Sequence, residues 1–128
     1  MEFAFQKLDV WQLTVEFADA VISAAENLQT PRQHFRLVEQ LEAASTSIAM
    51  NIAEGKGRYS KKEFVHFLYI ARGSLYETIT LLTIIQRRGW IDANVMASLS
   101  GQADVVARII AGLINLLKAV PRASRLEI

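Results

Sequence analysis

The sequence contains no cysteine and only two prolines, Pro31 and Pro121, among its 128 residues. Without cysteine the chain can form neither a disulfide framework nor a thiolate metal site. No uninterrupted apolar run reaches the about 20 residues that a membrane-spanning helix needs. The first residues do not combine a basic stretch with an apolar one, as a signal peptide would. We therefore expect a cytoplasmic protein without membrane association.

Charge of one sign is also scarce, because the formal net charge is only +1. A balance this small does not predict nucleic-acid binding by itself, although a local basic patch would still matter. Hydrophobic residues, in contrast, make up 52% of the chain. A chain of this length with so many apolar residues is expected to fold as one domain around a real core.

Apolar residues recur at helical spacing in four long segments that short turns separate. Such a pattern predicts an all-α protein, an antiparallel up-down-up-down four-helix bundle. The single domain spans 1–128, with helices at about 10–27, 33–54, 61–87 and 93–119 and a C-terminal tail at 120–128. In the last helix the expected core face comprises Val95, Leu99, Val106, Ile109, Leu113, Leu117 and Val120, and Met96, Ile110 and Ile114 widen it.

Several residues mark the expected ends of these helices. Asp9 and Asp92 are predicted N-caps, and Ser60 with Glu63 has the spacing of a capping box. Gly55 is predicted to end the second helix in the left-handed conformation. Gly73 stands in the middle of a helix, where it costs about 1 kcal/mol relative to alanine, so we expect it to permit a close contact.

The helices carry more apolar stripes than one bundle core requires. One explanation is a thick core with bulky side chains, since apolar residues are also common on surfaces. The other, which we favour, is burial between subunits of a homo-oligomer. The candidate interface residues are Trp11, Val15, Ile22, Ile70, Leu81, Ile84, Ile110 and Ile114.

A set of polar residues accompanies the second and third helices at helical spacing. Glu54 lies near a helix C-terminus, where the helix dipole disfavours a negative charge, so it should have a cationic or donor partner such as Arg58 or Arg72. The set forms either a hydrogen-bonded network that fixes helix register or a ligand pocket with perturbed carboxylates. Its members are Gln40, Ser47, Asn51, Glu54, Arg58, Arg72 and Glu77.

Catalytic and metal-binding patterns are weak. Glu63 and His66 have the Glu-x-x-His spacing of di-iron bundles, but the only other histidine, His34, has no glutamate three residues before it. The chain also lacks a Gly-x-Ser-x-Gly nucleophile elbow. We therefore predict a protein that is not an enzyme and has no metal or cofactor.

Basic residues are expected to gather at one end of the bundle, where the second turn and both termini meet. The candidate nucleic-acid-binding residues there are Lys56, Arg58, Lys61, Lys62, Arg122 and Arg125. A ring of subunits would multiply this patch and bind phosphate backbone in a salt-dependent way. Tyr59 and Tyr69 offer stacking surfaces, and ordinary surface charge is the alternative explanation.

Several motifs, taken together, resemble the small four-helix-bundle family encoded in intervening sequences of bacterial 23S rRNA genes. The resemblance covers about Leu8 to Leu117. The motifs are Leu8-Asp9-Val10-Trp11-Gln12, Gln40-Leu41, Ser47-Ile48, Asn51-Ile52-Ala53-Glu54-Gly55, Arg58-x-Ser60-x-x-Glu63-Phe64, Phe67-Leu68-x-Ile70-Ala71-x-Gly73-Ser74-Leu75-x-Glu77 and Gly89-Trp90-Ile91.

This resemblance implies a cytosolic bacterial protein that assembles into a ring, a homopentamer in known relatives. No enzymatic activity is established for the family. A distant relative is the accessory protein of diversity-generating retroelements, a basic pentameric barrel that binds a reverse transcriptase and nucleic acid. Relatives commonly carry two arginines after the Gln-Leu of the second helix, where this chain has Glu42 and Ala43. That departure removes positive charge from this part of the second helix and weakens the implied binding of RNA or of a retroelement protein.

These observations favour a non-catalytic oligomeric scaffold or interaction protein, whose partner and biochemical role the sequence does not define. The alternative is a ring that binds RNA or DNA through the basic end of the bundle.

Overall fold

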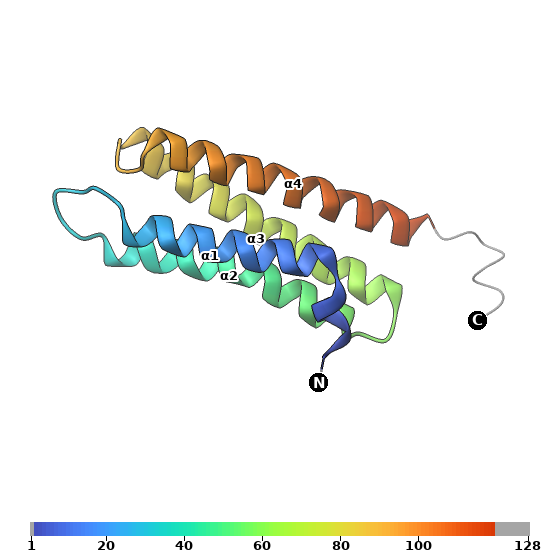
Figure 1. Ribbon diagram of the computed structural model, residues 1–128. Coiled ribbons are helices and arrows are strands. Elements are labelled where there is room, and N and C mark those ends of the chain that lie inside the picture. The colour runs from blue at the N-terminus through green and yellow to red at the C-terminus, as the bar shows by residue number, and fades with distance from the viewer. Residues whose placement is uncertain (1, 120–128) are drawn as a thin grey trace, which may run out of the picture.

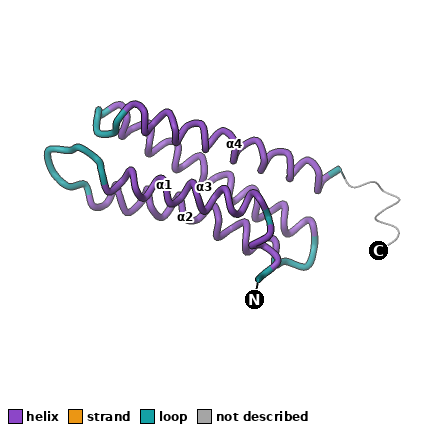
Figure 2. The backbone as a smooth tube through the Cα atoms, in the orientation of Figure 1, coloured by secondary structure: helices purple, strands orange, loops and turns teal. Residues whose placement is uncertain are grey.

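The computed structural model describes residues 2–119, and four long helices dominate it (Figure 1). A short 3-10 helix, η1 (Ala4–Lys7), precedes α1 (Asp9–Glu26), α2 (Phe35–Lys56), α3 (Lys61–Arg87) and α4 (Ala93–Lys118). Consecutive helices run in opposite directions and pack in sequence order, and α1 also packs against α4. Only helices, turns and loops occur in the described part of the chain (Figure 2). The predicted all-α bundle of four helices is confirmed, whereas the predicted tail lies outside the described residues.

The core is built from apolar residues at three- and four-residue spacing on the inward side of each helix. Burying one such large side chain contributes about 1.5–3 kcal/mol, so these stripes provide most of the stabilisation. The largest fully buried side chains are Phe17, Val21, Leu41, Ile48, Ile52, Leu68, Leu75, Leu82, Ile85, Leu99, Val106 and Ile110.

The buried stripe of α4 differs from the predicted one. Its buried residues are Met96, Leu99, Ala103, Val106, Ile110 and Ile114, whereas Val95 is 40% exposed. Ile109, Leu113 and Leu117 are half-buried at the edge of the stripe, and Val120 lies outside the described residues. Because α4 is apolar around most of its circumference, its pattern alone did not define which stripe faces α1 and α3.

Two predicted N-caps are confirmed. The Asp92 carboxylate accepts hydrogen bonds from the backbone N–H groups of Asn94 (2.8 Å) and Val95 (3.3 Å). Ser60 Oγ accepts one from the Glu63 N–H (3.1 Å) and lies 3.2 Å from the Glu63 carboxylate. The prediction for Asp9 is wrong, because Leu8 occupies the N-cap and Asp9 is the first helical residue. At this position the negative charge of Asp9 still interacts favourably with the positive end of the helix dipole.

Gly55 does not end α2, which continues to Lys56. The residue is buried inside the helix, and a Cβ atom placed on it would lie 2.7 Å from the Phe67 Cβ and 3.0 Å from the Phe64 ring. This glycine therefore serves the close approach of α2 and α3 rather than a left-handed cap. Among the described residues, the glycine with positive φ is Gly89 (φ 74°), in the turn between α3 and α4.

By length and composition, α4 is the one helix among residues 2–119 that would suit a membrane span. Core helices of soluble bundles often have the same length and apolar composition. Here the stripe from Met96 to Ile114 packs against the other helices.

Candidate functional site

A polar seam joins α2 and α3 halfway along the bundle. Ser47 Oγ and Ser74 Oγ share a hydrogen bond of 2.9 Å across the two helices. The Asn51 side-chain amide donates to Ser47 Oγ (2.9 Å) and to the Ser47 carbonyl oxygen (2.8 Å). Small side chains at these positions allow the two helix backbones to approach closely. The seam therefore fixes the register of α2 against α3.

The other predicted members of the polar set lie in separate groups. Glu54 pairs with Arg58 one turn later (2.5 Å), and the Arg58 guanidinium also lies 4.8 Å from the centre of the Phe67 ring. Both charged groups are substantially exposed, so the pair contributes at most about 1 kcal/mol. Gln40 and Glu77 are exposed and make no side-chain hydrogen bond or ion pair within the described part of the chain.

Arg72 belongs to a different group, on the side of α3 that borders α4. Its guanidinium lies 4.8 Å from the centre of the Tyr69 ring and 5.8 Å from that of Tyr76. Lys118, from the end of α4, donates a hydrogen bond to the Tyr69 hydroxyl (3.1 Å). Arg72 was predicted to belong to the polar set of α2 and α3, and this cluster was not predicted. The seven-residue spacing of Tyr69 and Tyr76 was the available signal.

The basic end contains the predicted cations that fall within residues 2–119. Lys56, Lys61 and Lys62 are exposed around the turn between α2 and α3, close to the N-terminus and to the end of α4 (Figure 1). No described carboxylate forms an ion pair with these three lysines, whereas Arg58 is paired with Glu54. Arg122 and Arg125 lie outside the described residues. The fully exposed Tyr59 ring projects from the same turn.

The predicted interface residues separate into buried and accessible groups. The prediction for Ile110 and Ile114 is wrong, since both lie in the core, at 0% and 3% exposure. They lie in the buried stripe of α4, one position along the chain from the predicted core residues Ile109 and Leu113. Of the others, Val15, Ile70 and Ile84 are exposed, and Trp11, Ile22 and Leu81 are partly buried.

An apolar groove runs between α1 and α2 on the outside of the bundle, with a volume of about 480 Å³. Met50, 68% exposed, and Val15, 40% exposed, lie on its walls. At its end the Phe5 ring packs edge-on against Trp11, with ring centres 5.3 Å apart. The complete lining is Phe5, Trp11, Val15, Ala18, Asp19, Ile22, Thr46, Ala49, Met50 and Ala53.

A second apolar set lies on the outer face formed by α2 and α3. Ile70, Ser74, Leu81 and Ile84 follow one another at spacings of four, seven and three residues, which keeps them on one side of α3. The Ser74 contact with Ser47 places this side next to α2. Gly73 is exposed nearby, and a Cβ atom built on it would meet nothing within 4 Å. The close contact predicted for Gly73 is therefore absent inside the protomer.

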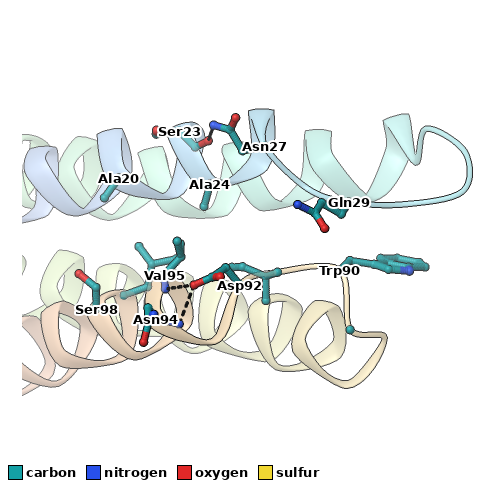
Figure 3. Close-up of a pocket in the computed structure, with 13 residues that line it drawn as sticks. Ala20, Ser23, Ala24, Asn27, Gln29, Trp90, Asp92, Asn94, Val95 and Ser98 are labelled. Atoms are coloured by element: carbon teal, nitrogen blue, oxygen red, sulfur yellow. Dashed lines mark hydrogen bonds between the residues drawn. The ribbon is translucent and has the colours of Figure 1, made fainter.

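A groove of about 650 Å³ lies between the end of α1 and the start of α4 (Figure 3). Two of its polar side chains are engaged in local structure. Asp92 caps α4, and the Asn27 side chain donates to the Ser23 carbonyl oxygen (2.7 Å). Asp92 is its only charged residue, so the groove offers no pair of groups for acid–base chemistry.

Metal-binding geometry is also absent from residues 2–119, where no three His, Asp or Glu side chains gather closely enough to hold an ion. Glu63 is bonded to Ser60 at the start of α3. His66 packs edge-on against the Phe67 ring, with ring centres 5.6 Å apart.

The described residues therefore define a four-helix protein with a structural polar seam, exposed apolar faces and unpaired surface cations. Residues 6–112 match the model of the 23S rRNA-intervening sequence protein family, and the chain belongs to this family. No curated protein matches the chain.

A solved structure supports the fold independently. It is the crystal structure of a protein with unknown function from the S23 ribosomal protein family of Bacteroides thetaiotaomicron VPI-5482, 24% identical to this chain. The similarity covers 82% of this chain and 97% of that one, with a TM-score of 0.76.

Proposed function

We propose that the protein assembles with copies of itself into a small ring and acts as a non-catalytic scaffold. The observation that carries this proposal is the exposure of large apolar side chains on two different faces. One face is the groove between α1 and α2, where Met50 is 68% exposed. The other is the outer face of α2 and α3, where Ile70 and Ile84 are 40% and 46% exposed.

Two different faces favour a head-to-tail contact, in which one face of each copy packs against the other face of the next. Such contacts close into a ring when the two faces point in suitable directions. The angle between them is about 90° in a ring of four copies and about 108° in a ring of five. Neighbouring faces of a four-helix bundle point about 90° apart. The arrangement around α2 thus suits a small ring, and the family resemblance favours five copies.

Gly73 adds support to this assignment. A glycine inside a helix costs about 1 kcal/mol relative to alanine, and no atom of residues 2–119 lies within 4 Å of a Cβ built on Gly73. A second copy packed on the outer face of α2 and α3 would gain from the missing side chain by approaching the α3 backbone.

The ring is tested by multi-angle light scattering on the intact protein and on one variant in each face. Met50→Glu and Ile84→Glu place a charge on exposed positions, so each variant should fold and lose the higher assembly. Leu116→Glu is the matched control, because Leu116 is 69% exposed on α4, away from both faces. A monomeric wild-type protein at micromolar concentration would refute the proposal.

Mixing the two variants gives a sharper test of head-to-tail packing. Each variant keeps one intact face, so a one-to-one mixture should form a dimer through the two intact faces and stop there. A mixture that remains monomeric, or a ring that tolerates both charges, would contradict this arrangement of faces.

A second candidate function is binding of RNA or DNA at the basic end. Lys56, Lys61 and Lys62 support it, because no described carboxylate pairs with them. Binding should weaken steeply as salt rises, and the double variant Lys61→Ala/Lys62→Ala should flatten the plot of log affinity against log salt. Each lost phosphate contact removes about 0.7–0.9 from the slope, and an unchanged slope would reject the role of these lysines.

A further inference from the structure

We infer that a single-stranded nucleic acid binds along the side of α3 that borders α4, on a surface we name the tyrosine–cation stripe. The stripe consists of Lys62, Tyr69, Arg72, Tyr76 and Lys118. This inference rests on the second candidate function, nucleic-acid binding, and assigns to it a strand type and a path. It extends the site from the turn lysines to the middle of the bundle.

Sequence spacing places the stripe on one side of the helix. Lys62, Tyr69 and Tyr76 are each seven residues apart, and Arg72 lies between the two tyrosines. Seven residues are close to two helical turns, so the three side chains project in similar directions. The distance along the axis from Lys62 to Tyr76 is about 21 Å at about 1.5 Å per residue. That length suits about four nucleotides, the lower end of single-strand site sizes.

Cations and rings alternate along the stripe and contact each other directly. The Arg72 guanidinium lies 4.8 Å from the centre of the Tyr69 ring and 5.8 Å from that of Tyr76. Lys118 Nζ donates to the Tyr69 hydroxyl at 3.1 Å and lies 5.6 Å from the ring centre. The rings thus hold the two cations in place, while Tyr69 and Tyr76 remain 37% and 53% exposed.

The positive charge of the stripe is not neutralised by the described residues. Lys62, Arg72 and Lys118 take part in no ion pair there. The two glutamates of α3 lie elsewhere: Glu63 bonds to Ser60, and Glu77 projects about 100° around the helix from Tyr76. On α4 the nearest acidic residue along the chain, Asp104, is paired with Arg108 at 3.0 Å. An anionic ligand would therefore meet cations without competition.

The cations and the exposed tyrosine rings of the stripe together indicate which ligand it would bind. Exposed cations suit any polyanion, but exposed tyrosines between them suit a strand whose bases are free to stack. Duplex DNA hides its bases and would use only the charges. An acidic peptide would likewise use only the charges. The stripe lies on the α3–α4 side of the bundle, where Lys118 of α4 contacts Tyr69.

Fluorescence anisotropy with a labelled oligothymidine, a matched duplex and polyglutamate as competitor tests the inference on the full chain. Tyr76→Leu removes one exposed ring and keeps an apolar side chain. Phe35→Leu is the control, because Phe35 is an aromatic residue 75% exposed at the start of α2, at the other end of the bundle from the basic turn. Tyr76→Leu should weaken single-strand binding about 5- to 150-fold with an unchanged salt slope, and Phe35→Leu should have no such effect. Arg72→Gln and Lys118→Gln should each lower the slope by about 0.7.

The possible outcomes separate this inference from the function on which it rests. Absence of binding to any nucleic acid at low salt would reject both. Salt-dependent binding that needs Lys61 and Lys62 but tolerates Tyr76→Leu, Arg72→Gln and Lys118→Gln would reject the stripe alone. Equal affinity for the duplex, or competition by polyglutamate as strong as by unlabelled strand, would also overturn it. Circular dichroism confirms that each variant compared keeps its helical content.

Discussion

Gly55→Ala should destabilise the protein, although alanine is the better helix former. The added Cβ would lie 2.7 Å from the Phe67 Cβ, 3.0 Å from Phe64 Cδ1 and 3.4 Å from the Phe64 carbonyl oxygen. The Phe64 ring can rotate away, but the Phe67 Cβ is fixed to the α3 backbone. Relief of the clash therefore requires the two helices to separate at this contact.

The magnitude follows from two opposing contributions to the free energy of unfolding. Alanine in place of a helical glycine stabilises by about 1 kcal/mol. Overpacking in a filled contact destabilises by about 1–3 kcal/mol. We expect Gly55→Ala to lose up to about 2 kcal/mol in total. Gly101→Ala supplies the control, since it is also an interior helical position, with no neighbour within 4 Å of the added Cβ.

Urea denaturation followed by circular dichroism measures both variants at one protomer concentration, because self-association makes stability depend on concentration. Gly101→Ala should be more stable than the wild type by about 1 kcal/mol. Both variants gain the same helix propensity, so their difference isolates the steric cost, about 1–3 kcal/mol. A Gly55→Ala protein as stable as the Gly101→Ala protein would refute the assignment of the close helix contact.

Three further changes test the caps, the seam and the last turn. Asp92→Ala removes the acceptor of the Asn94 N–H and should cost about 1 kcal/mol in urea denaturation, whereas Asp92→Asn should retain most of the stability; equal losses would contradict the capping role. A double-mutant cycle of Ser47→Ala and Ser74→Ala should give a coupling energy of about 0.5–1.5 kcal/mol, and additive effects would show that their hydrogen bond contributes nothing. Gly89→Val should lower the melting temperature, because a β-branched residue at φ 74° is strained; an unchanged temperature would argue against that backbone conformation.

Much of the fold follows from local chemistry that the sequence displays. Asp92 and Ser60 are caps whose hydrogen bonds reach only two or three residues along the chain, so their roles are visible without knowledge of the fold. The role of Gly55 depends on Phe67, which another helix brings to it, and a glycine near a helix end looks the same in either role. The stripe of α4 is a similar case, because helix partners selected Ile110 and Ile114 from several apolar alternatives.

The polar set shows the same limit for the candidate site. Ser47 and Asn51 have one helical turn between them, and their grouping follows from the spacing alone. Arg72 has spacing that suits either neighbour of α3, and only the packed bundle places it between Tyr69 and Tyr76. The contacts of a residue with neighbouring helices are therefore the ones that sequence spacing alone does not predict.

The helices form two hairpins, α1 with α2 and α3 with α4. At the end of the bundle where α1 ends and α4 begins, a contact links these two hairpins. The Gln29 N–H donates to the Trp90 carbonyl oxygen at 2.9 Å, and the His34 ring stacks on the Trp90 ring with centres 4.4 Å apart. At the other end the two hairpins share the covalent turn between α2 and α3. A hinge motion about that turn must first break the Trp90 contacts. Hydrogen exchange at the Gln29 amide therefore reports how often the bundle opens, independently of helix fraying.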